Sequence, residues 1–172
     1  MKAILMSIRP QYVAKILNGN KTIEIRKKFP KDYVGWVYIY CCKNKPNLYR
    51  HFKGEFLLLK ETKKICLWNG KVIARFWCDK VEPAYKFYVE ELCQLACINK
   101  DELYKYAGGW YKTDDLLAIN IDKVEIFDKP KEISEFKVID YFIEQPRING
   151  WVKQEIYKPL TKAPQSWCYT EV

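Results

Sequence analysis

The chain has 172 residues, of which 49% are hydrophobic and 16% aromatic, and its formal net charge is +9. This length and hydrophobic content exclude an intrinsically disordered chain and predict one domain, spanning residues 1–172, with its own core. The apolar runs are far shorter than a membrane span, and no charged-then-apolar leader begins the chain. We therefore expect a cytoplasmic protein without a membrane partner.

The positive charge is concentrated near the N-terminus. Residues 1–64 hold 15 Lys/Arg and 4 Asp/Glu, a net charge of +11, whereas residues 65–172 hold 15 Lys/Arg and 17 Asp/Glu, a net charge of −2. Phosphate backbones are the commonest partners of a basic face, and abundant aromatic rings can stack on bases. Nucleic acid is the expected partner, although a solvated lysine-rich surface would show the same charge.

The seven cysteines do not predict a disulfide framework or a zinc site. Their number is odd, no Cys-x-x-Cys pair occurs, and His51 is the one histidine. Cys93 and Cys97 lie one helical turn apart, but too few further ligands are available for zinc. We expect buried thiols, no metal and no cofactor.

The first elements are a strand and a short helix. Residues 3–8 form an apolar run that predicts a buried strand, and Pro10 suits the first position of a helix that extends to about Asn18. Arg9 precedes this helix and is placed either at the mouth of a site or in solvent.

The stretch that follows the helix carries the candidate site. Gly19 is placed to end the helix, and from Lys21 the apolar period changes to two, with Ile23 and Ile25 on one face of a strand. Alternation puts three polar side chains on the other face beside Lys21, namely Thr22, Glu24 and Arg26.

Gly19, Lys21, Glu24 and Arg26 fill the pattern G-x-K-x-x-E-x-R between a first helix and a second strand, and this pattern resembles the ASCH domain of the PUA-like superfamily. The opening up to Arg26 and the ending Pro164-Gln-Ser-Trp-Cys-Tyr169 also resemble small phage and prophage ASCH proteins. The resemblance implies an α+β fold, a PUA-like β-barrel of mixed short strands with helical insertions and a side cleft. It also implies RNA binding at that cleft.

Some ASCH relatives are amidohydrolases of a modified nucleoside, and others have been described as ribonucleases. The amidohydrolase pattern resembles Lys-x-x-Thr, with a threonine nucleophile, but the position three after Lys21 holds Glu24. An enzyme of this chain would instead use Glu24 as a general base and Lys21 to stabilise an oxyanion. A purely structural ion pair between these residues is the third alternative.

A basic turn follows the motif strand. Lys27 and Lys28 are placed to neutralise phosphates, and Phe29 either stacks on a base or folds back into the core. Residues 34–42 predict a central strand, and residues 43–64 an insertion of mixed character.

Residues 64–82 predict a hairpin around Asn69-Gly70, and residues 86–109 a helical insertion. Within that insertion Asn99 and Glu102 have the spacing of a capping box. Residues 116–127 predict one long strand, kinked at Asp122-Lys123.

Residues 137–162 read as a polar section that could cover the cleft, and residues 163–172 as a strand that closes the barrel. At its entry, Gln165 and Ser166 offer hydrogen bonds to base edges, and Trp167 either stacks on a base or packs in the core.

The favoured function is binding of RNA or another single-stranded nucleic acid at a basic cleft. A small hydrolase of a nucleoside-like molecule, or a ribonuclease, is the alternative, and the sequence leaves open both catalysis and the oligomeric state.

Overall fold

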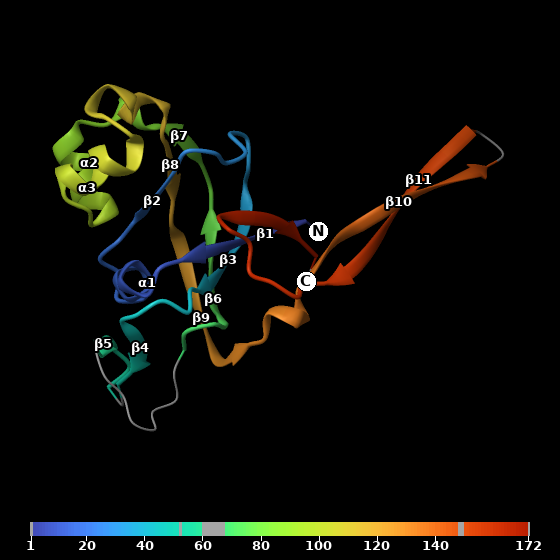
Figure 1. Ribbon diagram of the computed structural model, residues 1–172, viewed down its shortest axis with the longest axis horizontal. Helices are drawn as coiled ribbons and strands as arrows, with labels where there is room; N and C mark the ends of the chain where they lie inside the picture. Colours follow the sequence, from blue (N-terminus) through green and yellow to red (C-terminus); the bar gives the residue numbers. More distant parts are fainter. Residues whose placement is uncertain (1, 52, 60–67, 148–149, 172) are drawn as a thin grey trace.

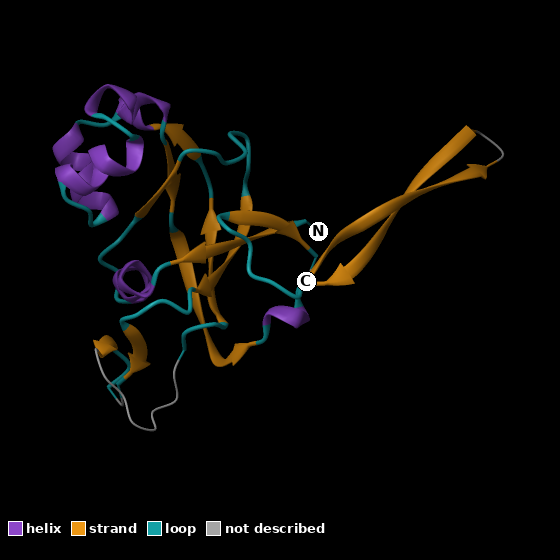
Figure 2. Ribbon diagram, in the orientation of Figure 1, coloured by secondary structure: helices purple, strands orange, loops and turns teal. Residues whose placement is uncertain are grey.

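The structure is a computed structural model, and it describes residues 2–51, 53–59, 68–147 and 150–171. Strands form its centre, a group of helices covers one side, and a long two-stranded ribbon projects from the other (Figures 1 and 2). In the described part of the chain, no helix is both long and apolar enough to cross a membrane.

The central sheet has five strands in the order β12-β1-β3-β6-β9. β1 pairs parallel with β3, and the other neighbours are antiparallel. All six residues of β1 are buried, as the apolar run predicts for a strand in mid-sheet. The bounds are Ala3–Ile8 for β1, Gly35–Cys41 for β3, Val72–Cys78 for β6, Asp122–Lys131 for β9 and Trp167–Thr170 for β12.

A second sheet has the order β2-β8-β7, and the helical group packs on it. β2 is Ile23–Arg26, β8 is Leu117–Asn120 and β7 is Val81–Pro83. The helical group comprises the 3-10 helices η1 (Ala84–Lys86) and η2 (Trp110–Asp115) and the α-helices α2 (Val89–Ala96) and α3 (Lys100–Ala107). α2 and α3 fall within residues 86–109, where helices were predicted, whereas η2 follows that stretch.

Helix α3 shows how the sequence sets its own limits. Asn99 accepts the backbone N–H of Glu102, and the Glu102 side chain accepts the backbone N–H of Asn99, so the predicted capping box is confirmed. Gly108 ends the helix with a φ of 95°, a left-handed conformation that favours glycine.

The prediction of one kinked strand over residues 116–127 is wrong. β8 belongs to the second sheet and β9 to the central sheet, and the chain crosses between them at Ile121. Lys123, at the predicted kink, has a φ of 44° and is the second residue of β9.

Helix α1 (Pro10–Leu17) begins with proline, as predicted, and buries Val13, Ala14 and Ile16. Near it lies a small hairpin of β4 (Asn47–Arg50) and β5 (Phe56–Leu59), within the predicted insertion. The first strand of the hairpin predicted around Asn69-Gly70 falls at residues 65–68, and all but the last of these lie outside the described residues.

Residues 137–162 differ most from expectation. β10 (Lys137–Arg147) and β11 (Gly150–Pro159) form a two-stranded sheet of their own, with the 3-10 helix η3 (Ile133–Glu135) at its base. This ribbon points away from the helical group (Figure 1), so it does not cover the site described below.

The predicted closed barrel is not found. The described strands form four separate sheets, and β12 and β9 lie at opposite edges of the central one. β12 pairs with β1 as a terminal edge strand, which covers one edge of β1 without joining the sheet into a ring. The α+β class, rich in short strands, is confirmed.

Candidate functional site

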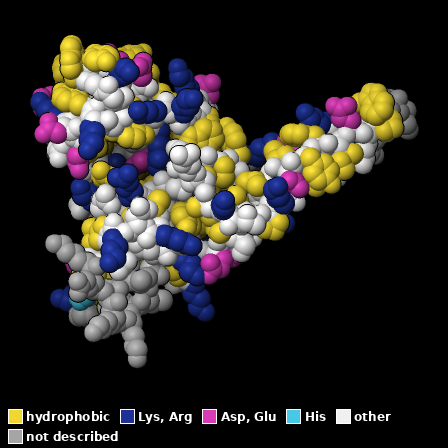
Figure 3. Space-filling model, viewed as in Figure 1, with side chains coloured by type: hydrophobic (Ala, Val, Ile, Leu, Met, Phe, Trp, Pro, Cys, Tyr) yellow, Lys and Arg dark blue, Asp and Glu magenta, His cyan; other side chains and the backbone are white. Residues whose placement is uncertain are grey.

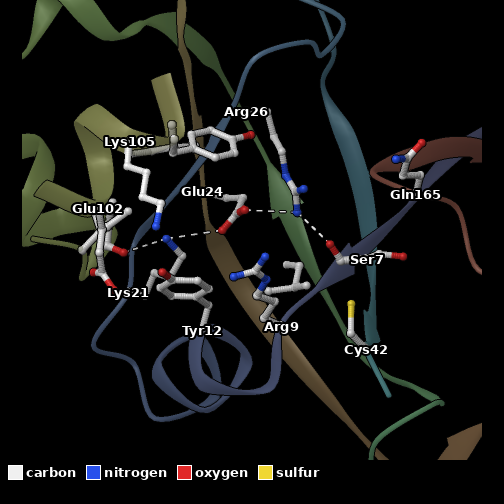
Figure 4. A pocket seen from close by; sticks show the side chains of 15 residues that line it. Ser7, Arg9, Tyr12, Lys21, Glu24, Arg26, Cys42, Glu102, Lys105 and Gln165 are labelled. Atoms are coloured by element: carbon white, nitrogen blue, oxygen red, sulfur yellow. Dashed lines mark hydrogen bonds and ion pairs between the residues drawn. The ribbon is translucent and has the colours of Figure 1, made fainter. Parts of the chain in front are cut away.

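A pocket of about 520 Å³ lies between α1, β2, the start of β12 and the helical group (Figure 4). Its size is within the range of small-molecule sites, which bury most of one bound group. Among the predicted site residues, five line it: Arg9, Lys21, Glu24, Arg26 and Gln165.

Lys21 is 4% exposed, and its ammonium contacts two oxygens of the protein. Its Nζ donates to Ala96 O over 2.7 Å and lies 3.3 Å from Glu24 Oε2. Ala96 is the last residue of α2, where the helix dipole favours a cation. Lys21 therefore joins the helical group to the motif strand.

Glu24 is 7% exposed and lies between two cations. Its Oε1 is 3.1 Å from Arg26 Nη2, and its Oε2 faces Lys21. Arg26 Nη2 also donates to Ser7 O over 2.8 Å, which connects β2 to β1 (Figure 4). A buried carboxylate needs such partners, because an unpaired charge away from water is costly.

Arg26 is not completely satisfied. Its Nη1 makes a long contact of 3.4 Å with Ser166 Oγ, and its Nε is buried without any hydrogen-bond partner among the described residues. Buried donors in native proteins are nearly always paired, so this Nε is an exception among the described residues.

Two further cations lie at the rim of the pocket and, unlike Lys21, they are exposed. The side chains of Arg9 and Lys105 are exposed, line the pocket, and make no hydrogen bond or ion pair with the described residues. Figure 4 shows them reaching into the pocket, Arg9 from the position just before α1 and Lys105 from α3. Together they bring two positive charges to the mouth of the pocket, where Glu102 brings one negative charge.

Aromatic and thiol groups complete the walls. Burial, reinforced by the charge of Glu102, raises the pKa of Tyr12, whose ring lies 5.4 Å from Lys21 Nζ. Burial also raises the pKa of the Cys42 thiol, although Arg26 and Arg9 oppose this. Both groups therefore stay neutral near pH 7 and offer hydrogen-bonding or stacking surfaces rather than charge.

The remaining predicted residues lie outside the pocket. Phe29 is 6% exposed and packs edge-on against Trp167, with 5.5 Å between ring centroids. Of the two alternatives for Phe29, the structure therefore shows the one in which the ring folds back into the core. Trp167 is half-buried beside it. Trp167 Nε1 donates to Lys28 O over 2.7 Å. Lys27 and Lys28 are exposed on the neighbouring turn, and Lys27 Nζ lies 5.5 Å from the Tyr106 ring.

Thr22 is also separate from the pocket. It precedes β2, and it lines a smaller hollow of about 180 Å³ on the side of Phe87 and Leu95. Thr22 therefore does not line the pocket that Glu24 and Arg26 line.

Sequence reasoning missed most of the opposite wall. The unexpected lining residues are Ser7, Ile8, Tyr12, Ile25, Cys42, Ala96, Ile98, Glu102, Lys105 and Tyr106. Glu102 carried a capping signal and Tyr12 a core signal, but neither pattern indicates a cleft. Only the docking of α2 and α3 on β2 brings Ala96, Ile98, Glu102, Lys105 and Tyr106 to Lys21 and Glu24.

The described residues contain no group of three His, Cys, Asp or Glu side chains placed to hold a metal ion. The polar side chains of the pocket are mostly cations and hydrogen-bond donors, which suits an anionic or oxygen-rich ligand.

No protein-family model matches the sequence, and no curated protein matches it significantly. Solved structures, in contrast, do match this chain. The crystal structure of ASCH from Zymomonas mobilis has a TM-score of 0.58 and 14% identity, over 97% of this chain and 86% of that chain.

Two single-substitution variants of the same Zymomonas mobilis protein match similarly. The tyrosine-to-phenylalanine variant has a TM-score of 0.54 at 14% identity, covering 98% of this chain and 90% of that one. The serine-to-alanine variant has a TM-score of 0.54 at 12% identity, covering 97% and 87%. Likeness at this identity is a likeness of fold, and the chain has the fold of an ASCH domain.

Proposed function

We propose that the protein binds single-stranded RNA, or a closely related single strand, with one nucleotide in the pocket between α1, β2 and α3. The observation that carries this proposal is the pair of unpartnered cations, Arg9 and Lys105, at the rim of a 520 Å³ pocket. Cations that the protein does not neutralise are available to phosphates, and a pocket of this size admits one unstacked base.

Within this proposal the buried residues hold the pocket in shape. Lys21 is committed to Ala96 and Glu24, so it positions the helical group and is not itself a phosphate ligand. Arg26 has a donor left over at Nε, and a carbonyl or phosphate oxygen of the ligand would give it an acceptor after a small shift of the side chain.

The same geometry argues against the hydrolase alternative. A general base must be within hydrogen-bond reach of the proton it takes, with a free acceptor. Each carboxylate oxygen of Glu24 already faces a cation, and the Lys21 ammonium donates to Ala96 O as well as facing Glu24. These contacts favour a role in positioning over a role in proton transfer.

The basic turn extends the proposed surface. Lys27 and Lys28 are exposed beside the pocket, and Lys27 lies against Tyr106, which lines it. A strand whose base occupies the pocket would continue over this turn, where the lysines meet the next phosphates and Tyr106 offers a ring for stacking.

The test is a fluorescence-anisotropy titration of labelled single-stranded RNA, single-stranded DNA and duplex RNA of equal length, over a series of salt concentrations. We expect single strands to bind best and affinity to fall steeply with salt. Arg9→Ala and Lys105→Ala should each weaken binding several-fold and lower the salt slope by about 0.7, the value for one phosphate contact in a single strand.

Lys100→Ala is the matched control, because Lys100 lies on the same helix as Lys105 but pairs with Glu90 and does not line the pocket. Charge reversal at Lys27 and Lys28 tests the extension separately. If Arg9→Ala and Lys105→Ala bind RNA as wild type does, the pocket is not the site and the proposal is wrong.

A further inference from the structure

Two aromatic side chains of β12 continue outward from the pocket. Gln165 lines the pocket, Trp167 and Tyr169 follow it along the chain, and alternation puts their side chains on one face of β12. Trp167 is half-buried, whereas Tyr169 is 43% exposed. The two rings pack edge to face with 5.6 Å between their centroids. Tyr169 therefore presents an exposed ring that is supported by a second ring beneath it.

The strand register gives the distance of this ring from the pocket. Ser7 lines the pocket, and Tyr169 pairs with Ile4, three residues earlier on the same strand β1. At a rise of about 3.3 Å per residue, about 10 Å of strand separate the two positions. Single-strand sites on small strand-rich domains cover about 4–16 nucleotides, so one strand can reach both positions.

Unpaired lysines lie beside the same ring pair. Trp167 Nε1 donates to Lys28 O over 2.7 Å, which holds the basic turn against Trp167. Lys28 and Lys31 are exposed and make no hydrogen bond or ion pair through their side chains with the described residues. Residues 27–32 hold three lysines and one aspartate, a net charge of +2. Figure 3 shows basic and hydrophobic side chains next to one another over the middle of the body, where Figure 1 draws β12.

A ring on which a base can stack and a cation for the adjoining phosphate are the two groups that bind single strands without reading their sequence. We propose that Tyr169 is a second base-stacking subsite, reached by the same single strand whose base occupies the pocket. The strand runs from the pocket along the start of β12, with a phosphate at Lys28 and a later base on Tyr169. This inference rests on the proposed function, because one strand fills both subsites.

Exposure of a ring does not by itself indicate such a subsite. Tyr88 is 83% exposed, more than Tyr169, but it directly precedes α2, whose first turn carries Glu90 and Glu91. Carboxylates at that position repel a phosphate backbone. The lysines beside Tyr169, in the basic half of the chain, attract one, and this difference assigns nucleic acid to Tyr169 and not to Tyr88.

The test is isothermal titration calorimetry with oligouridylates of about 2, 4, 6 and 8 nucleotides. We expect the affinity of wild type to rise with length. Tyr169→Ala should bind the longest strand at least about 5-fold more weakly, the lower limit for the loss of one stacked base. The dinucleotide should bind wild type and Tyr169→Ala equally, because it fills the pocket alone.

Three further variants identify the groups involved. Tyr169→Phe keeps the ring and should keep the wild-type affinity at every length. Lys28→Ala should weaken binding of the longest strand and lower its salt slope by about 0.7, the value for one phosphate contact in a single strand. Tyr88→Ala is the matched control, since it removes a more exposed ring and should bind every length as wild type does. Melting temperatures check that each variant is folded.

Three outcomes would overturn the proposal: equal affinity of wild type and Tyr169→Ala for the longest strand, a Tyr169→Phe variant as weak as Tyr169→Ala, or a loss in Tyr169→Ala that is already complete with the dinucleotide. If Arg9→Ala and Lys105→Ala weaken binding and Tyr169→Ala does not, only the second subsite fails. If Tyr169→Ala weakens binding and the other two do not, the subsite stands and the pocket fails. Wild type that binds no oligouridylate overturns both.

Discussion

Lys21 and Glu24 form an ion pair of 3.3 Å in which both side chains are almost completely buried. The pair lies at the junction of three elements, because Lys21 also binds the C-terminal end of α2 and Glu24 also holds Arg26, which reaches β1. The motif that makes the sequence recognisable is thus first a joint between the helical group and the two sheets. The same contacts connect β2 to the end of α2, and residues of both elements line the pocket.

The first prediction concerns the cost of breaking this joint. Lys21→Met removes one partner of a buried pair and leaves Ala96 O and one oxygen of Glu24 without their cation. We expect the free energy of unfolding to fall by about 3–5 kcal/mol, as for other buried pairs that lose one member. Urea unfolding, followed by tryptophan fluorescence, measures it.

Lys27→Met is the control for this change, because Lys27 is exposed on the adjoining turn and its loss should cost no more than about 0.5 kcal/mol. If the two variants lose similar stability, the pair contributes little and the joint must be held by apolar packing alone.

The second prediction separates the core from the binding surface. Phe29 is buried against Tyr33 and Trp167, whereas Tyr106 is exposed and lines the pocket. Phe29→Ala should therefore cost about 3–5 kcal/mol of stability and leave the RNA affinity of the folded protein unchanged. Tyr106→Ala should reduce RNA affinity with little effect on stability. A lower affinity in Phe29→Ala, measured at a temperature where it is folded, would return Phe29 to the binding surface.

The sequence predicts the near wall of the site well because that wall is local. Glu24 and Arg26 share a strand face, and Lys21 lies just ahead, so alternation alone places them together. The far wall comes from α3, about 80 residues away in the chain, and nothing in its own pattern indicates what it faces. In the sequence, Lys105 looks like any other solvent-exposed lysine of a helix. Only the docking of the helix shows that it lines the pocket.

The ribbon escapes prediction for a different reason. Burial gives strands their alternating pattern, and β10 and β11 have no core beneath them for most of their length. Their exposed residues, such as Gln145, Lys153 and Gln154, resemble those of a loop. The division of residues 117–131 between two sheets was equally hidden, since both strands read as one apolar run and only their different partners, β2 and β7 for β8 and β6 for β9, separate them.

The third prediction concerns the helix that carries the far wall. Asn99→Ala removes the side-chain acceptor for the Glu102 backbone N–H, and we expect a loss of about 1 kcal/mol. Asn99→Ser should keep most of the stability, since serine also caps well. Because α3 presents Lys105 and Tyr106, amide hydrogen exchange should rise over residues 100–107 in the alanine variant. Unchanged exchange there would show that packing on α2 and β2, not the cap, fixes the helix.

The fourth prediction concerns pH. Burial first, and the charge of Asp79 second, raise the pKa of the Cys78 thiol to about 12, above its ordinary value of about 8.5. The thiol is completely buried, and its one proton has two backbone acceptors within reach, Lys80 O at 3.5 Å and Tyr33 O at 3.7 Å from the sulfur. When the chain unfolds at alkaline pH this thiol ionises, which favours the unfolded state.

The sign follows from the raised pKa: the contribution of Cys78 to stability is complete below about pH 8.5 and is lost as the pH rises toward its folded value. Between about pH 9 and 11, wild type should lose up to about 1.4 kcal/mol more per pH unit than Cys78→Ala, because one proton is released on unfolding. Urea unfolding at several pH values measures the two slopes. Val72→Ala, a buried change in the same strand without an ionisable group, should keep the wild-type slope although it lowers stability. Parallel slopes for wild type and Cys78→Ala would mean that the thiol already ionises within the folded protein, against the burial that the structure shows.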